Sequence, residues 1–337
     1  MMQHGGDLAA ASLTYGTPEQ GWLDLSTGIS PHSYPFSSDC LSEALIRELP
    51  DSGPYQRLAE TAARTYQAKT SSQLALASGS QGVIQTLPSI LPGKNIIILS
   101  PTYNEHAKAW GKAGWTVKPE PDLEPEPDSD VILIVNPNNP TGRLFNQTDL
   151  LSLADKLTEK GRWLIIDEAF GDLVPDQSLV PHVAGRNLIV LKSIGKFYGL
   201  AGLRVGFAVA DESIVEQLKD RIGPWPITGP SLVLAEQALS DHGWQAEQST
   251  RLRILRERLD TILDRHGLSP IGGTDLFQLI ETDGAKTLHD HLARRGIWTR
   301  IFDYAPTWMR IGLPDERQNG FDRFEQALSE WSSTHAS

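Results

Sequence analysis

The stretch most informative about the fold reads Lys192-Ser193-Ile194-Gly195-Lys196-Phe197-Tyr198. It follows an apolar run at residues 188–191, which is short and rich in β-branched residues, as buried strands are. A lysine at the end of a buried strand is costly unless its amine is used, and desolvation lowers the pKa of an amine toward that of a nucleophile. Lys196 is therefore a candidate Schiff-base nucleophile, with an ordinary surface lysine as the alternative.

Similar apolar runs occur on both sides of this stretch, separated by segments with helical spacing. Strands that alternate with helices predict an α/β protein with a mostly parallel sheet covered on both faces. The expected strands lie at residues 74–77, 96–99, 131–135, 164–166 and 205–209, and the expected helices at residues 58–66, 106–113 and 148–160.

The last third of the chain has a different pattern. A long amphipathic segment at residues 246–265 precedes two candidate strands, at residues 276–280 and 309–312. The turn-forming Pro224-Trp225-Pro226 lies just before this region. We therefore expect a large domain over residues 39–225 and a small domain formed by residues 1–38 and 226–337.

Charge and cysteine content narrow the class of protein. The chain has 337 residues, with 42 acidic and 30 basic side chains and a net charge of −12, which argues against nucleic-acid or membrane-surface partners. The chain has a single cysteine, Cys40, so an intrachain disulfide is excluded. The lack of a disulfide, of a signal peptide and of an apolar run long enough to span a membrane favours a cytoplasmic location. His289 and His291 stand two apart on a predicted helix and point apart, so no metal site is expected.

Polar motifs follow several of the predicted strands, where open α/β sheets bind ligands. Asp167 ends one strand, and its carboxylate could either keep a pyridine nitrogen protonated or cap the next helix. Asn139 lies between two prolines after residue 135, and Tyr103 follows residue 99, where its ring could lie against a flat cofactor. The small residues at 77–82 start a predicted helix whose backbone N–H groups could bind a phosphate.

In this order and spacing the motifs resemble the fold-type-I enzymes that use pyridoxal phosphate, the aspartate-aminotransferase superfamily. The resemblance covers nearly the whole chain and implies a large domain with a mostly parallel seven-stranded sheet and a smaller α/β domain. It implies pyridoxal 5'-phosphate as the cofactor, with Lys196 forming the Schiff base and Asp167 beside the pyridine nitrogen. The other cofactor contacts that it implies are Asn139, Tyr103, Gly79, Ser80, Gln81, Ser193 and Arg204.

Tyr55, in Ser52-Gly53-Pro54-Tyr55, matches a tyrosine that this superfamily inserts into the active site of a second subunit. The resemblance therefore implies a homodimer with shared active sites. The alternative is an ordinary tyrosine in a turn.

Within the superfamily, four motifs resemble the threonine-phosphate decarboxylases, which make aminopropanol phosphate for cobalamin. Phe170 favours this branch over the histidinol-phosphate aminotransferases, which usually carry a tyrosine there. Gly195 departs from the branch, where a hydroxyl residue is expected. The alternatives are such an aminotransferase, or a pyridoxal-phosphate-binding sensor without activity, which the acidic charge disfavours. The four motifs are His4-Gly5-Gly6-Asp7, residues 24–29, Asp167-Glu168-Ala169-Phe170 and residues 193–198.

The resemblance also implies contacts to a phosphorylated amino-acid substrate. Arg310 matches the family arginine that binds the α-carboxylate through two parallel hydrogen bonds. Arg300 and His4 are expected at the substrate phosphate, with a surface salt bridge as the alternative for Arg300. Gly28, in the motif at residues 24–29, is the fourth expected substrate contact.

Overall fold

The computed structural model describes residues 5–37, 42–123 and 128–335. Its contacts divide the chain into two compact units. The large unit comprises Tyr34–Asn139 and Arg143–Gln245, and the small unit comprises Met1–Ser33, Pro140–Gly142 and Ala246–Ser337. Among the described residues, no helix is both long and apolar enough to cross a membrane.

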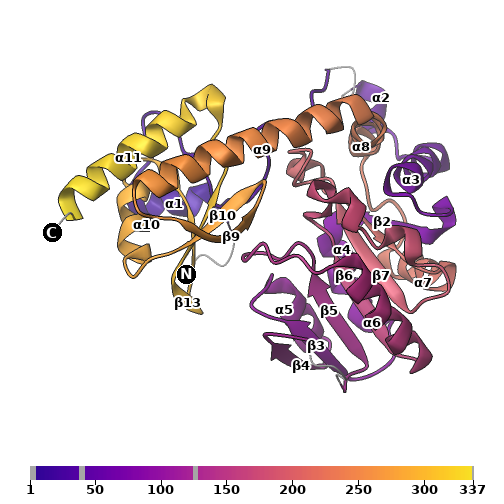
Figure 1. The fold of residues 1–337 in the computed structure, drawn as a ribbon. Coiled ribbons are helices and arrows are strands. Elements are labelled where there is room, and N and C mark those ends of the chain that lie inside the picture. Colours follow the sequence, from indigo (N-terminus) through magenta and orange to yellow (C-terminus); the bar gives the residue numbers. More distant parts are fainter. Residues whose placement is uncertain (1–4, 38–41, 124–127, 336–337) are drawn as a thin grey trace. The chain divides into compact units, whose positions relative to one another are not determined.

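The large unit is built on a seven-stranded sheet (Figure 1). One strand, β8, runs antiparallel to both of its neighbours, and the other pairs are parallel. This confirms the predicted α/β class and the mostly parallel sheet. In sheet order the strands are β2 (Leu74–Ser78), β8 (Val205–Val209), β7 (Leu188–Ser193), β6 (Trp163–Asp167), β5 (Val131–Val135), β3 (Asn95–Leu99) and β4 (Thr116–Glu120).

Helices surround this sheet, and most of them start at a side-chain cap. Asp51, Asn146, Asp211 and Thr228 each accept a hydrogen bond from a first-turn backbone N–H group, which stabilises a helix start. The helices of the large unit are α2 (Glu43–Arg47), α3 (Ser52–Tyr66), α4 (Gly79–Thr86), α5 (Glu105–Lys112), α6 (Gln147–Glu159), α7 (Glu212–Ile222) and α8 (Gly229–Ser240).

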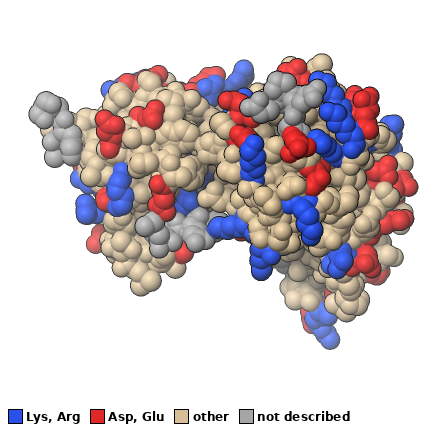
Figure 2. Space-filling model, turned by 90° about the horizontal axis from the view of Figure 1, so that it is seen from below, with Lys and Arg blue, Asp and Glu red and all other residues tan. Residues whose placement is uncertain are grey.

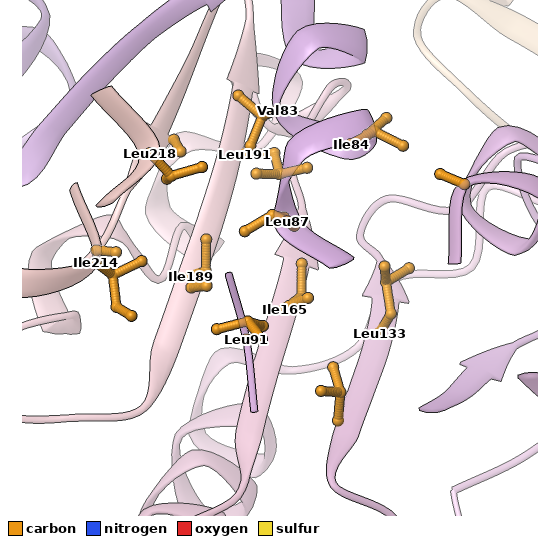
Figure 3. Close-up of a cluster of buried hydrophobic side chains, with 14 of the residues drawn as sticks. Val83, Ile84, Leu87, Leu91, Leu133, Ile165, Ile189, Leu191, Ile214 and Leu218 are labelled. Carbon is orange, nitrogen blue, oxygen red and sulfur yellow. The ribbon is translucent and has the colours of Figure 1, made fainter. Parts of the chain in front are cut away.

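One face of the sheet is packed by α4, α5 and α7. Figure 3 shows apolar side chains of α4 and α7 meeting those of the central strands. Full burial of one such side chain contributes about 1.5–3 kcal/mol, which explains why the central strands read as continuous apolar runs. The labelled members of this cluster are Val83, Ile84, Leu87, Leu91, Leu133, Ile165, Ile189, Leu191, Ile214 and Leu218.

The edge strand β4, Thr116–Glu120, is not among the strands that the sequence predicts. Its sequence is polar and it contains Pro119, so it lacks the apolar signal of a buried strand. Because β4 pairs only with β3, a proline is tolerated there.

The small unit contains a four-stranded antiparallel sheet, a short parallel pair and several helices. In the sheet, β13 (Ala305–Gly312) lies between β12 (Arg300–Phe302) and β10 (Phe277–Glu281), and β9 (Pro270–Thr274) follows β10. The parallel pair is β1 (Leu23–Asp24) with β11 (Ile297–Trp298). The helices are α1 (Leu8–Tyr15), α10 (Ala285–Ala293) and α11 (Gly320–His335), together with most of α9 (His242–Arg265).

The contacts place α8 in the large unit, whereas the predicted boundary lay at residue 225. The Tyr55 hydroxyl donates to Ile227 O at 2.7 Å, and Thr65 Oγ1 donates to Leu239 O at 2.8 Å. These bonds join α8 and the residues just before it to α3, and the chain passes to the small unit within α9, after Gln245. At the other end the division falls at residues 33 and 34 rather than 38 and 39.

Candidate active site

Most of the predicted site residues belong to one edge of the large sheet. Parallel strands end at the same edge, and the strand pairing puts β2 in the same direction as β7, β6, β5 and β3. The residues that end these strands, or follow them directly, are Gly79, Ser193, Lys196, Asp167, Asn139 and Tyr103.

Asp167 is a buried carboxylate with two hydrogen-bond donors. His106 Nε2 lies 2.8 Å from Asp167 Oδ2, and the Ala169 backbone N–H donates to Oδ1 at 2.9 Å. Both side chains are nearly inaccessible, with Asp167 2% and His106 1% exposed. The carboxylate is therefore held in one orientation, and charged hydrogen bonds of this kind are about twice as strong as neutral ones.

The sequence prediction did not include His106. It lies in the first turn of α5, three residues after Tyr103, and the two rings meet edge to face at 6.0 Å. Burial, together with the charges of Glu105 and Asp167, raises the pKa of Tyr103. In the sequence, the only indication of this role is that His106 lies three residues after the predicted cofactor contact Tyr103. Its partner Asp167 lies 61 residues further along the chain, and only the fold brings the two together.

Lys196 lies in the turn after β7 and is half-buried. Its Nζ atom is 5.5 Å from the centre of the Phe170 ring, which is 2% exposed. In the same turn, a Cβ atom at Gly195 would lie 3.2 Å from Ala201 Cα. This crowding favours glycine where the decarboxylase pattern predicts a hydroxyl residue.

The start of α4 is shaped to receive an anion. Ser78, the residue before this helix, makes no side-chain cap, in contrast to the residues that start α3, α6, α7 and α8. A Cβ atom at Gly206 would lie 2.2 Å from Ser80 N, so only glycine lets the helix start lie against β8. A Cβ at Gly79 would lie 2.7 Å from Arg204 Nη2, which places the guanidinium beside the same turn. Backbone N–H groups and a guanidinium together favour a phosphate.

Side-chain contacts tie the neighbouring loops to this edge. Thr102 Oγ1 donates to Asn138 Oδ1 at 2.6 Å, and Asn138 Nδ2 donates to Pro101 O at 3.0 Å. These bonds join the loop that carries Tyr103 to the loop that carries Asn139. The Tyr103 hydroxyl also lies 3.4 Å from Gln81 Oε1, which links it to the start of α4.

The predicted substrate arginines lie opposite each other in the small unit. Arg300 on β12 pairs in register with Arg310 on β13. Arg310 is 5% exposed, and burial together with the charge of Arg300 lowers its pKa to about 10. Two cations held side by side in a partly dry environment suit an anion that carries more than one charge.

The chain around Gly28 is held next to these arginines. Arg310 Nη2 donates to Ser26 O, and Gly28 follows in the left-handed conformation, with φ of 59°. Gly6 N donates to Ser26 Oγ at 2.8 Å, so the start of the chain also reaches this segment. His4, another predicted substrate contact, lies outside the described residues.

Comparison with known proteins identifies the family. Residues 45–324 match the family described as aminotransferase class I and II. The chain belongs to this family.

Individual relatives cover almost the full length. A threonine-phosphate decarboxylase of Pseudomonas aeruginosa is 44% identical over 331 residues, which are 97% of each chain. A threonine-phosphate decarboxylase of a Sinorhizobium species is 41% identical over 319 residues, or 93% of each chain. Among solved structures, the histidinol-phosphate aminotransferase of Sinorhizobium meliloti in complex with pyridoxal-5'-phosphate has a TM-score of 0.82 at 19% identity, covering 96% of this chain and 94% of that one.

The charged side chains of this acidic chain are distributed over its surface. On the face drawn in Figure 2, acidic and basic side chains are interspersed rather than gathered by sign. The net charge of −12 therefore describes the molecule as a whole, whereas Arg204, Arg300 and Arg310 stand where local anion binding is expected.

The two histidines of α10 make structural contacts. His289 Nδ1 lies 2.8 Å from Thr299 Oγ1, and His291 Nε2 lies 2.8 Å from Ala327 O. Over the described ranges, no three His, Cys, Asp or Glu side chains are grouped so that they could hold a metal ion.

Proposed function

We propose that this chain is a pyridoxal-phosphate-dependent decarboxylase that converts L-threonine O-3-phosphate to (R)-1-amino-2-propanol O-2-phosphate for cobalamin biosynthesis. The observation that carries the substrate assignment is the pair Arg300 and Arg310, since the substrate has a carboxylate and a phosphate. Two relatives more than 40% identical over at least 93% of the chain bear the name of this enzyme, which supports the choice of reaction.

The residues at the edge of the large sheet fit pyridoxal phosphate. Asp167, buried and oriented by His106, is suited to a protonated pyridine nitrogen. The Nδ1 atom of His106 is buried and has no hydrogen-bond partner among the described residues, so this side chain has further bonding capacity. The uncapped start of α4 with Arg204 suits the phosphate, and Lys196 is the amine that would hold the aldehyde. Tyr103 and Asn139 would contact the ring.

Pyridoxal phosphate supplies an electron sink that stabilises negative charge at the substrate Cα. The residues of the chain decide which bond to Cα breaks, because the bond perpendicular to the cofactor ring is the one that is weakened. We assign to Arg310 the binding of the substrate carboxylate, and to Arg300, with His4, the binding of its phosphate. Gly28 would contact the substrate as well. These contacts would orient the bond from Cα to the carboxylate, which breaks to release CO₂.

A proton must then reach Cα, and Lys196 is the candidate that delivers it. Phe170 lies beside the Lys196 amine and offers no hydroxyl group. It therefore excludes water without adding a hydrogen-bond donor at the site. In this respect the site differs from an aminotransferase site that carries tyrosine at the same position.

We further infer a homodimer and a cytoplasmic location. The single cysteine fits a reducing compartment. For Tyr55 to donate to the cofactor phosphate of the partner subunit, its hydroxyl would have to exchange its present acceptor, Ile227 O. Light scattering of the protein with and without pyridoxal phosphate tests the dimer, and fractionation of cells tests the location.

The reaction is tested with purified protein, pyridoxal phosphate and O-phospho-L-threonine. We expect CO₂ and aminopropanol phosphate in equal amounts, without any need for a keto acid. Transamination of histidinol phosphate that depends on 2-oxoglutarate, with no CO₂, would instead identify an aminotransferase. Lys196→Ala should abolish both turnover and the visible absorbance of bound cofactor, and a cofactor-loaded, active variant would contradict the role of this lysine.

A further inference from the structure

A second lysine, four residues before Lys196, is buried at the end of β7. Lys192 is 1% exposed, and its ammonium group lies 3.0 Å from Asp172 Oδ1 and 3.4 Å from Glu168 Oε2. The same nitrogen lies 4.6 Å from the centre of the Tyr66 ring. None of the roles assigned above uses this lysine.

The cluster around Lys192 buries two carboxyl groups beside one amine, and burial raises the pKa of both Glu168 and Asp172. Burial opposes the charged form of Lys192, but the charges of Asp172 and Glu168 outweigh burial and raise the pKa of the lysine. Glu168 also accepts hydrogen bonds from Ser178 Oγ at 2.6 Å and Leu179 N at 2.8 Å. Buried ions are tolerated only with good geometry and further hydrogen bonds, which Glu168 has. Asp172 Oδ2 is buried with no hydrogen-bond partner among the described residues, so Asp172 depends on its contact with Lys192.

The two acidic partners of Lys192 lie on either side of Phe170 in the sequence. Glu168 precedes Phe170 by two residues and Asp172 follows it by two, so one ammonium group binds both flanks of the segment. A Cβ atom at Gly171 would lie 2.7 Å from Glu168 Cβ and 3.1 Å from Lys192 Nζ. The segment therefore lies directly on the lysine, and a bulkier residue at this position would displace it.

Side-chain contacts are needed here because the sheet ends. The pairing of β6 with β7 stops at Asp167 and Leu191, and Glu168 N donates to Leu191 O at 2.9 Å. Beyond this point, residues 168–172 and the turn that carries Lys196 are not joined by strand pairing. The ion pairs of Lys192 with Glu168 and Asp172 connect the end of β7 to residues 168–172 instead.

We propose that Lys192 is a positioning residue that binds Glu168 and Asp172 and so holds the Phe170 ring against Lys196. The amine of Lys196 is thereby confined to one side of its turn, where it holds the cofactor and later delivers the proton. Because Lys196 receives its role from the proposed function, the role of Lys192 rests on that function as well. A merely structural ion pair would affect the stability of the fold without affecting Lys196.

Asp172→Asn is the milder test of this role, since it keeps the shape of the side chain and leaves Lys192 paired with Glu168. We expect kcat for phospho-threonine to fall by about 10- to 100-fold, the effect of a small misplacement of a reacting group, while KM changes less than about twofold. The visible circular dichroism of bound cofactor should also change, because it reports the surroundings of Lys196. Lys192→Met should have the same effects, and Lys192→Arg, which can still bind both carboxylates, should retain most of the activity.

The matched control is Asp130→Asn, also in the large unit. Asp130 Oδ2 accepts from Lys94 N at 2.8 Å and Asn95 N at 3.0 Å, at the opposite edge of the sheet. This variant should lose stability but keep the kcat and visible dichroism of the wild type.

Asp172→Asn and Lys192→Met with wild-type kcat and visible dichroism would overturn the positioning role, even if both proteins melt earlier. If Lys192→Met does not fold, Asp172→Asn alone decides. If the wild type binds pyridoxal phosphate but does not decarboxylate phospho-threonine, the proposed function fails separately, and the dichroism of the bound cofactor still decides the role of Lys192.

Discussion

Replacing His106 by leucine isolates the hydrogen bond that orients Asp167. Leucine is apolar and has a similar volume, so the change removes the donor without opening a large cavity. Asp167 then keeps only the Ala169 backbone donor, while remaining buried. The lost bond is short and its acceptor is charged, so its removal costs about 1.5–3 kcal/mol.

Thermal unfolding of the cofactor-free protein measures this cost directly. A loss of this size lowers Tm by about 3–12 °C, since 1 kcal/mol corresponds to about 2–4 °C for a unit as large as this one. His106→Gln, whose amide can still donate to the carboxylate, is the control and should recover part of the loss. The leucine variant should also bind pyridoxal phosphate more weakly, because the carboxylate that we propose faces the pyridine nitrogen is no longer held in one orientation.

A leucine variant that melts within about 1 °C of the wild type would refute this account of the pair. So would a glutamine variant that is no more stable than the leucine variant. In either case the 2.8 Å contact between His106 and Asp167 would contribute nothing measurable to the stability of the fold.

Three further predictions concern other parts of the molecule. Burial lowers the pKa of His289 from 6.5 to about 4, so as the pH falls the unfolded chain binds a proton before the folded chain does. The free energy of unfolding of the small unit should therefore fall by about 3 kcal/mol between pH 6.5 and pH 4. Chemical denaturation across this range should show a smaller loss for His289→Gln. Arg310→Lys should lower kcat/KM for phospho-threonine by about 100-fold without changing cofactor affinity, because an ammonium group cannot make two parallel hydrogen bonds to a carboxylate. A decrease of less than about threefold would contradict the assignment of Arg310 to the substrate carboxylate. Gly206→Ala should abolish cofactor binding in a fluorescence titration, since its Cβ would lie 2.2 Å from Ser80 N, whereas Gly202→Ala, with open space around the new Cβ, should bind as the wild type does.

The sequence alone determined the class of the fold and much of the edge where the site lies. Strands buried on both faces must be apolar throughout, so β3, β5, β6, β7 and β8 are visible as local runs. Residues directly after such strands share one edge, which is why Lys196, Asp167 and Asn139 could be predicted from their distance to a run. The polar edge strand β4 carries no such signal and was missed.

Only the tertiary structure decided which residues meet. Asp167 and His106 are 61 positions apart, and Arg300 faces Arg310 only because of the register between β12 and β13. The contact of Lys192 with both flanks of Phe170 likewise depends on two strands lying side by side. Local periodicity reports how a segment is buried, but partners distant in sequence are set by strand order and register, which the packing of the whole unit selects.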